Sequence, residues 1–153
     1  MKFCEKYTDI NYIKSDDCRK AITLKDKGGS NSTYICSNNY EKRIIVYIVD
    51  NGIIKSQTTA KCDFALYNAK EDVIYFIELK GSNYDRAIEQ IESAINNLIR
   101  NNHISINSVN ARIVLTRAKA PQINTTKEIK LKKILATCKG NLKKATTQLT
   151  ENI

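Results

Sequence analysis

The chain has 153 residues, of which 42% are hydrophobic and 27% are charged, and its formal net charge is +9 at pH 7. This length and composition describe one globular domain with a single core, and they exclude an intrinsically disordered chain. No stretch approaches the ~20 consecutive apolar residues that a membrane-spanning helix needs. We therefore expect a single domain over residues 1–153 and no membrane partner.

The cysteine spacing and the N-terminal residues bear on the cellular compartment. The five cysteines are scattered without the close pairs that are typical of structural zinc sites, so we expect mostly reduced thiols. Glu5 stands where a signal peptide needs its apolar stretch, and no small-residue cleavage site follows it. Both observations predict a cytoplasmic protein. The single histidine, His103, disfavours a His-based catalytic triad or a multi-histidine metal site.

The first half of the chain predicts a short helix and several strands. The helix lies within residues 2–13, a Gly-rich loop covers residues 26–32, and a strand runs from Ile35 to about Asn38. Residues 43–49 are β-branched and aromatic, which is typical of a buried strand. The Asp-Asn-Gly run that follows predicts a hairpin turn with a return strand over residues 53–55.

The middle of the chain predicts two further strands and a long helix. A short strand covers residues 62–67, and residues 73–80 are apolar until two charges appear at the end, which is typical of a central strand covered on both faces. Apolar residues then recur at helical spacing over residues 84–100.

The last third predicts a strand over residues 109–116, a basic helix over residues 126–137 and a final strand over residues 142–149. The complete order of elements predicts an α/β fold with a mixed central β-sheet flanked by helices.

Three charged residues at strand ends suggest a catalytic centre. Glu78 and Lys80 are two residues apart, so on a strand they project from the same face. If the two strands before the long helix form a hairpin, Asp63 falls opposite them. Two carboxylates and a main-chain carbonyl, that of Leu79, offer Mg²⁺ the oxygen ligands it prefers, and Mn²⁺ should be able to substitute. Lys80 can orient the attacking water, act on its proton or stabilise the transition state.

This pattern of Asp63, fourteen intervening residues and Glu78-Leu79-Lys80 resembles the PD-(D/E)XK nuclease superfamily, which includes restriction endonucleases, resolvases and repair exonucleases. The resemblance covers residues 43–117 and implies a restriction-endonuclease-like core. It also implies metal binding by the Asp and the Glu, and a catalytic role for the Lys.

Other features of the superfamily are matched less closely. Gln90, on the following helix, resembles a Gln that some branches keep to arrange the site and contact DNA. Cys62 stands where the pattern has Pro. Many members add an acidic metal ligand from an N-terminal helix, for which Glu5 and Glu41 are the candidates, and neither has a convincing context.

The positive charge gathers at the C-terminal end of the chain. Residues 111–153 contain ten basic and two acidic residues, which accounts for +8 of the net charge. Such a field attracts polyanions, whereas the alternative is a solvated, solubilising face. The nucleic-acid-binding candidates are Arg117, Lys130, Lys132 and Lys133.

These observations together predict a Mg²⁺-dependent nuclease that cleaves DNA. A homodimer would supply two sites for duplex cutting, a partner protein would supply targeting, and genome defence, mobile elements or repair would be the context by analogy alone. The alternatives are a non-catalytic nucleic-acid-binding or assembly module that keeps the fold, and a nuclease that cleaves RNA.

Overall fold

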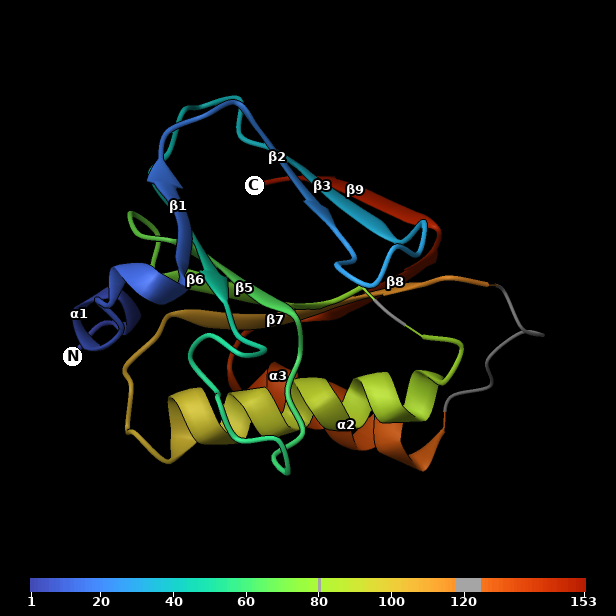
Figure 1. Ribbon diagram of the computed structural model, residues 1–153. Helices are drawn as coiled ribbons and strands as arrows, with labels where there is room; N and C mark the ends of the chain where they lie inside the picture. Colours follow the sequence, from blue (N-terminus) through green and yellow to red (C-terminus); the bar gives the residue numbers. More distant parts are fainter. Residues whose placement is uncertain (80, 118–124) are drawn as a thin grey trace.

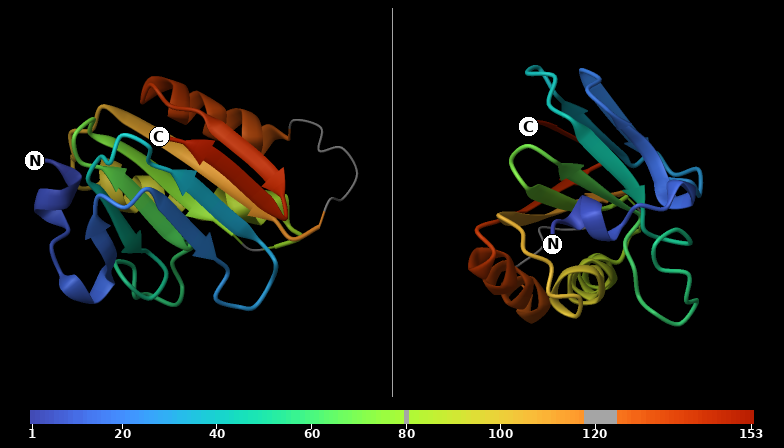
Figure 2. Two further views of the ribbon diagram at one scale, coloured as in Figure 1. Left: turned by 90° about the horizontal axis from the view of Figure 1, so that it is seen from above. Right: turned by 90° about the vertical axis from the view of Figure 1, so that its left-hand side faces the viewer.

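The computed structural model describes residues 1–79, 81–117 and 125–153, arranged in three layers (Figure 1). A six-stranded sheet forms the middle layer. Two helices cover one of its faces, and a three-stranded sheet covers the other, as the side view in Figure 2 also shows. The mixed α/β architecture expected from the sequence is therefore confirmed.

The six-stranded sheet is antiparallel at one edge and parallel at the other. Its strands lie in the order β1-β4-β5-β6-β7-β8, and the neighbours β6, β7 and β8 are parallel. The bounds are β1 Ile13–Asp17, β4 Ile44–Ile48, β5 Phe64–Asn68, β6 Val73–Glu78, β7 Ser108–Leu115 and β8 Leu142–Thr146.

The helices connect the parallel strands and pack beneath them. Helix α2 (Tyr84–Ile95) links β6 to β7 and continues as a π-helical turn, Asn96–Arg100, so the helix expected over residues 84–100 is present with a change of pitch. Helix α3 (Thr126–Thr137) precedes β8 and matches its expected bounds. The short helix expected near the N-terminus is α1 (Phe3–Lys6), and a 3₁₀ turn at Ile10–Tyr12 follows it.

The smaller sheet is built from strands that lie far apart in the sequence. It contains β2 (Ala21–Lys25), β3 (Thr33–Ser37) and β9 (Gln148–Asn152), in that order, with β3 parallel to β9. The expected final strand over residues 142–149 is in fact two strands. They separate at Thr147, which has a positive φ of 68°, so β8 stays in the large sheet while β9 enters the small one.

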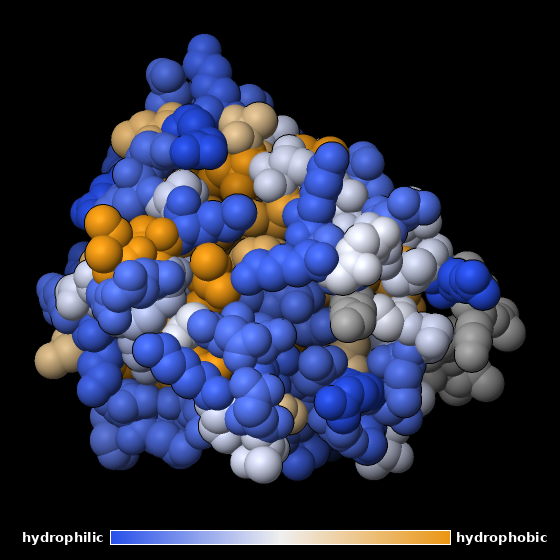
Figure 3. All heavy atoms as spheres, in the orientation of Figure 1, coloured by the Kyte–Doolittle hydropathy of each residue, from blue (hydrophilic) through white to orange (hydrophobic). Residues whose placement is uncertain are grey.

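Side chains along the buried strands point alternately to the two faces of the large sheet, so a core forms on each face. On β5, Ala65 and Tyr67 belong to the core under the helices, whereas Phe64 and Leu66 belong to the core under the small sheet. Both cores explain why this strand is buried at every position. The face in Figure 3 is mainly hydrophilic, with apolar residues in separate patches. Among the helices of the described residues, none is long and apolar enough to cross a membrane.

The return strand expected over residues 53–55 is wrong. Asn51 does take a positive φ of 58°, but the chain wraps tightly there, and Gly52 lies so close to Ile48 that a Cβ would come within 2.0 Å of the Ile48 carbonyl oxygen. Ile54 makes only an isolated bridge to Asp50. The partner of β4 is instead β5, reached after the intervening loop.

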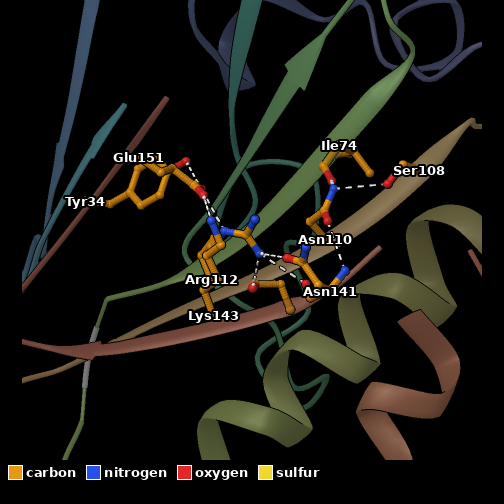
Figure 4. A network of polar contacts seen from close by, with 9 residues as sticks. Tyr34, Ile74, Ser108, Asn110, Arg112, Asn141, Lys143 and Glu151 are labelled. Carbon is orange, nitrogen blue, oxygen red and sulfur yellow. Dashed lines mark hydrogen bonds and ion pairs between the residues drawn. The ribbon is translucent and has the colours of Figure 1, made fainter. Parts of the chain in front are cut away.

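A buried polar network joins the two sheets (Figure 4). The Arg112 Nε on β7 donates to Glu151 Oε1 on β9 at 2.7 Å, and Tyr34 on β3 donates to the same oxygen at 2.6 Å. Arg112 also donates to Asn141 Oδ1 at 2.8 Å. Burial raises the pKa of Glu151, but these donors outweigh burial and hold the pKa below its ordinary value.

Removing one member of this network should strongly destabilise the fold. The side chains of Arg112 and Glu151 are only 3% and 6% exposed, so Arg112→Met leaves a buried carboxylate without its main partner. We expect a loss of about 3 kcal/mol in the free energy of unfolding, measured by urea denaturation. The Nζ of Lys143 lies 3.2 Å from Glu151 Oε2, but the Lys143 side chain is largely exposed to solvent. Lys143→Met should therefore lower the free energy of unfolding by less than about 1 kcal/mol. Equal losses for the two variants would contradict the assignment of the buried pair as the main link.

Candidate active site

The turn between β5 and β6 brings Asp63 and Glu78 to the same end of the large sheet. In this antiparallel hairpin Phe64 pairs with Ile77, so Asp63 immediately before β5 lies opposite Glu78 at the end of β6. The hairpin expected from the sequence is therefore confirmed. The carboxylate Oδ2 of Asp63 accepts a hydrogen bond from the main-chain N–H of Leu79 at 2.9 Å, which fixes the aspartate against the neighbouring strand.

The Glu78 side chain projects toward the helix-covered face of the sheet, because Phe76, its neighbour at even spacing on β6, lies in the core beneath the helices. Glu78 therefore stands at the edge of an apolar layer. Glu78 is only 2% exposed, and its Oε2 is buried without a hydrogen-bond partner among the described residues.

Burial, followed by the negative charge of Asp63, raises the pKa of Glu78 to about 9. The pKa of Asp63 is raised as well, chiefly by burial, although the Leu79 N–H offsets part of that effect. Two carboxylates with raised pKa values at one place repel each other when both are ionised, and a cation between them would relieve this repulsion.

The donor set at this place fits a hard cation. Asp63, Glu78 and the carbonyl of Leu79 are the oxygen ligands that the sequence predicts for Mg²⁺, and the unpartnered Glu78 Oε2 has acceptor capacity to spare. Within the described part of the chain, no group of three or more His, Cys, Asp or Glu side chains comes together to hold a metal. The protein would thus supply two carboxylates, and a cation here would retain water ligands.

Two further acids lie near the pair and were not identified as site residues from the sequence. Asp50 follows β4 at the same end of the sheet, and its charge contributes to the raised pKa of both Asp63 and Glu78. Asp26, in the loop between β2 and β3, contributes to that of Asp63. The signal that could have revealed Asp50 is its place just after a strand that neighbours β5.

Gln90 supports the segment that carries Asp63. From α2, its Nε2 donates to the main-chain oxygen of Lys61 at 3.1 Å, two residues before the aspartate. Gln90 is therefore a positioning residue for this segment. The side chain of Lys61 turns away to donate to the main-chain oxygen of Ser56, and its Nζ lies 3.8 Å from Asp50 Oδ1.

The remaining acidic and catalytic candidates are placed differently. Lys80 lies outside the described residues. Glu41 precedes β4, which is antiparallel to β5, so it stands at the opposite end of the sheet from Asp63. Glu5 accepts a hydrogen bond from the Lys2 N–H at 2.8 Å and so caps its own helix. Helix α1 lies across the molecule from the start of α2 (Figure 1).

The basic candidates divide into two groups. On α3, Lys130 pairs with Glu92 at 3.0 Å and Lys132 pairs with Glu128 at 3.4 Å, so acidic partners offset part of their charge. Lys133 is exposed, and no ion pair to it is found among the described residues. Arg117, just beyond β7, lines a cavity at the same end of the sheet as the carboxylate pair.

No protein-family model, curated protein or solved structure matches this chain.

The raised pKa of Glu78 should make stability depend on pH. Its folded-state pKa of about 9 lies above its ordinary value of 4.5, so the free energy of unfolding should fall as the pH rises between these values. Glu78→Gln removes this ionisation while keeping the shape. In EDTA at about pH 8, the variant should therefore melt several degrees higher than the unchanged protein, with the difference shrinking toward about pH 5.

Thermal unfolding followed by circular dichroism would measure this difference. As a control, Glu41→Gln removes an exposed acid at the other end of the sheet and should leave the pH dependence as it is. A stabilisation by Glu78→Gln that grows toward acid pH would contradict the raised pKa.

Proposed function

We propose that this protein is a metal-dependent nuclease that hydrolyses DNA phosphodiester bonds, with Mg²⁺ held by Asp63, Glu78 and the carbonyl of Leu79. The observation that carries the proposal is the carboxylate pair, of which Glu78 is buried and Asp63 is partly buried. Two carboxyl groups lie opposite each other at strand ends, and one Glu78 oxygen is buried without a partner among the described residues. A pair that served only the fold would leave this acceptor unsatisfied at a cost in stability.

The chemistry divides between the cation and the side chains. When bound, Mg²⁺ supplies positive charge for the scissile phosphate and makes a nearby water more acidic. Asp63 and Glu78 hold the cation at the end of the sheet, and the Leu79 N–H keeps Asp63 in place. The resemblance to the PD-(D/E)XK superfamily assigns Lys80 to the attacking water or to the charge of the transition state.

The charge of the chain supports nucleic acid as the substrate. A net charge of +9 favours encounter with polyanions. DNA is preferred to RNA because the sequence has no cluster of aromatic residues of the kind that readers of single-stranded RNA use. The five free cysteines favour action in the reducing cytoplasm. A homodimer would bring two such sites to a duplex, and a targeting protein would supply specificity.

A cleavage assay with conservative variants tests this proposal. Purified protein with Mg²⁺ or Mn²⁺ should nick plasmid DNA, and EDTA should stop the reaction. Asp63→Asn, Glu78→Gln and Lys80→Met should each lower the cleavage rate by at least about a hundredfold while the fold is kept. The assay should include linear, flapped, branched and single-stranded DNA as well as RNA. Asp63 and Glu78 would hold a cation for any of these substrates and do not select among them.

The matched control is Glu41→Gln, which removes a carboxylate at the far end of the same sheet and should leave cleavage unchanged. Full activity in all three site variants would reject the site. Nucleic-acid binding without cleavage of any substrate would instead favour the non-catalytic module.

The lysines of α3 offer a separate test of how DNA is bound. Replacing Lys130, Lys132 and Lys133 with Gln should weaken DNA binding and flatten its salt dependence, because fewer counterions are then released. Lys133 should contribute most, since acidic partners already offset Lys130 and Lys132. Fluorescence anisotropy over a range of salt concentrations measures both effects.

The control for this test changes the same charge elsewhere, with Lys6, Lys14 and Lys20 replaced by Gln. If the α3 variant keeps the salt dependence of the unchanged protein, the α3 lysines serve solubility rather than DNA binding.

A further inference from the structure

A cavity of about 370 Å³, here called the strand-end cavity, opens at the same end of the large sheet as Asp63 and Glu78. Three segments line it: the loop between β2 and β3, the residues that follow β6, and the residues that follow β7. The lining residues are Asp26, Gly28, Ser30, Gly81, Ser82, Thr116 and Arg117. Its position lies beyond the carboxyl ends of two parallel strands, which is where open α/β sheets generally bind their ligands.

Hydrogen bonds between the three segments hold the cavity in shape. The Thr116 N–H donates to the Gly81 carbonyl at 3.3 Å, which joins the chain after β7 to the chain after β6. The Thr116 hydroxyl lies 3.4 Å from that of Ser32, which joins the β2–β3 loop to both. The cavity therefore does not need a ligand to bring its walls together.

Several groups in the lining are suited to contact an anion, although much of its surface is apolar. Ser30, Ser82 and Thr116 carry hydroxyl donors, and Gly81, with a φ of +116°, leaves its main chain uncovered. Arg117 adds an exposed guanidinium that has no ion pair among the described residues. Hydroxyl groups, main-chain N–H groups and Arg are the usual contacts of nucleic-acid phosphates.

Among the described lining residues Asp26 is the acid, and it restricts where an anion can sit. The carboxylate Oδ1 of Asp26 accepts a hydrogen bond from the Gly28 N–H at 2.9 Å and so holds the loop in its turn. A phosphate is therefore expected on the side of the cavity that carries Arg117, where the cationic group lies.

The β2–β3 loop also connects the cavity to the carboxylate pair. Lys27 lies over the ring of Phe64 at 5.6 Å from the ring centroid, and Phe64 directly follows Asp63. The loop thus places one cation beside the strand that carries Asp63, while Arg117 places another at the cavity. A strand of nucleic acid that crossed the end of the sheet would meet both.

We propose that the strand-end cavity binds a backbone phosphate of the strand being cut, on one side of the scissile bond, with the guanidinium of Arg117 as its cationic contact. This inference rests on the proposed nuclease function and deepens it, because it makes the small sheet a wall of the substrate site. Arg117 acts in binding rather than in chemistry, so its loss is expressed in KM and not in kcat.

Cleavage kinetics with a labelled oligonucleotide test the inference in two ways. Arg117→Gln removes the charge, and Ser82→Leu fills the cavity. Each should raise KM about tenfold with kcat changed less than about twofold. In the Asp63→Asn background, which separates binding from cleavage, Arg117→Gln should reduce the slope of log affinity against log salt by about one.

The matched control is Lys70→Gln, which removes an exposed charge from the turn at the opposite end of β5 and should change none of these values. Unchanged KM and salt slope in both cavity variants, with cleavage intact, would overturn the phosphate site and leave the nuclease proposal standing. A protein that cleaves nothing but whose oligonucleotide binding still depends on Arg117 would keep the phosphate site and reject the nuclease.

Discussion

The pairing of β5 with β6 is the constraint on which the candidate site depends. A register with Phe64 opposite Ile77 sets Asp63 against Glu78, and a slip of one residue would send one carboxylate through to the other face of the sheet. The apolar residues of the two strands hold this register, because they fill one core on each face of the sheet. If they exchanged faces, the packing of both cores would be lost. The same packing that makes the hairpin stable therefore forces two acids together in a poorly solvated place, where the pKa of Glu78 rises to about 9.

Each of the three layers helps to position the residues around this hairpin. The helix layer supports the carboxylates from below, since Gln90 on α2 holds the main chain just before Asp63. The small sheet brings its loop to the end of the large sheet and closes one wall of the strand-end cavity. The buried Arg112–Glu151 pair ties that small sheet to β7, where Arg112 pairs with Ile77 beside Glu78, so this polar interaction helps to fix the position of the small sheet and its loop.

The sequence was informative where its pattern was strong and local. The long helix, the basic helix over residues 126–137 and the β5–β6 hairpin follow from apolar spacing, and the opposition of Asp63 and Glu78 follows from the hairpin. Strands β1 and β2 were missed because they carry few core residues: β1 has only partly buried or exposed positions, and β2 has just two buried residues. The return strand after Gly52 was wrong because a turn signal does not say which segment pairs next. Asp50, Asp26 and the strand-end cavity depend on segments that meet only in the folded chain, which local patterns do not describe.

The parallel pairing of β3 with β9 has a consequence for the order of folding. Strand β3 leaves the ribosome long before its partner β9, because helices α2 and α3 and the strands β4 to β8 lie between them, so during synthesis the β2–β3 hairpin has an open edge until β9 is made. Strands β4 to β7 and helix α2 can assemble beforehand from contacts closer in sequence. The small sheet beside the carboxylate pair is therefore completed only after Asp63 and Glu78 have already been brought together by the β5–β6 hairpin.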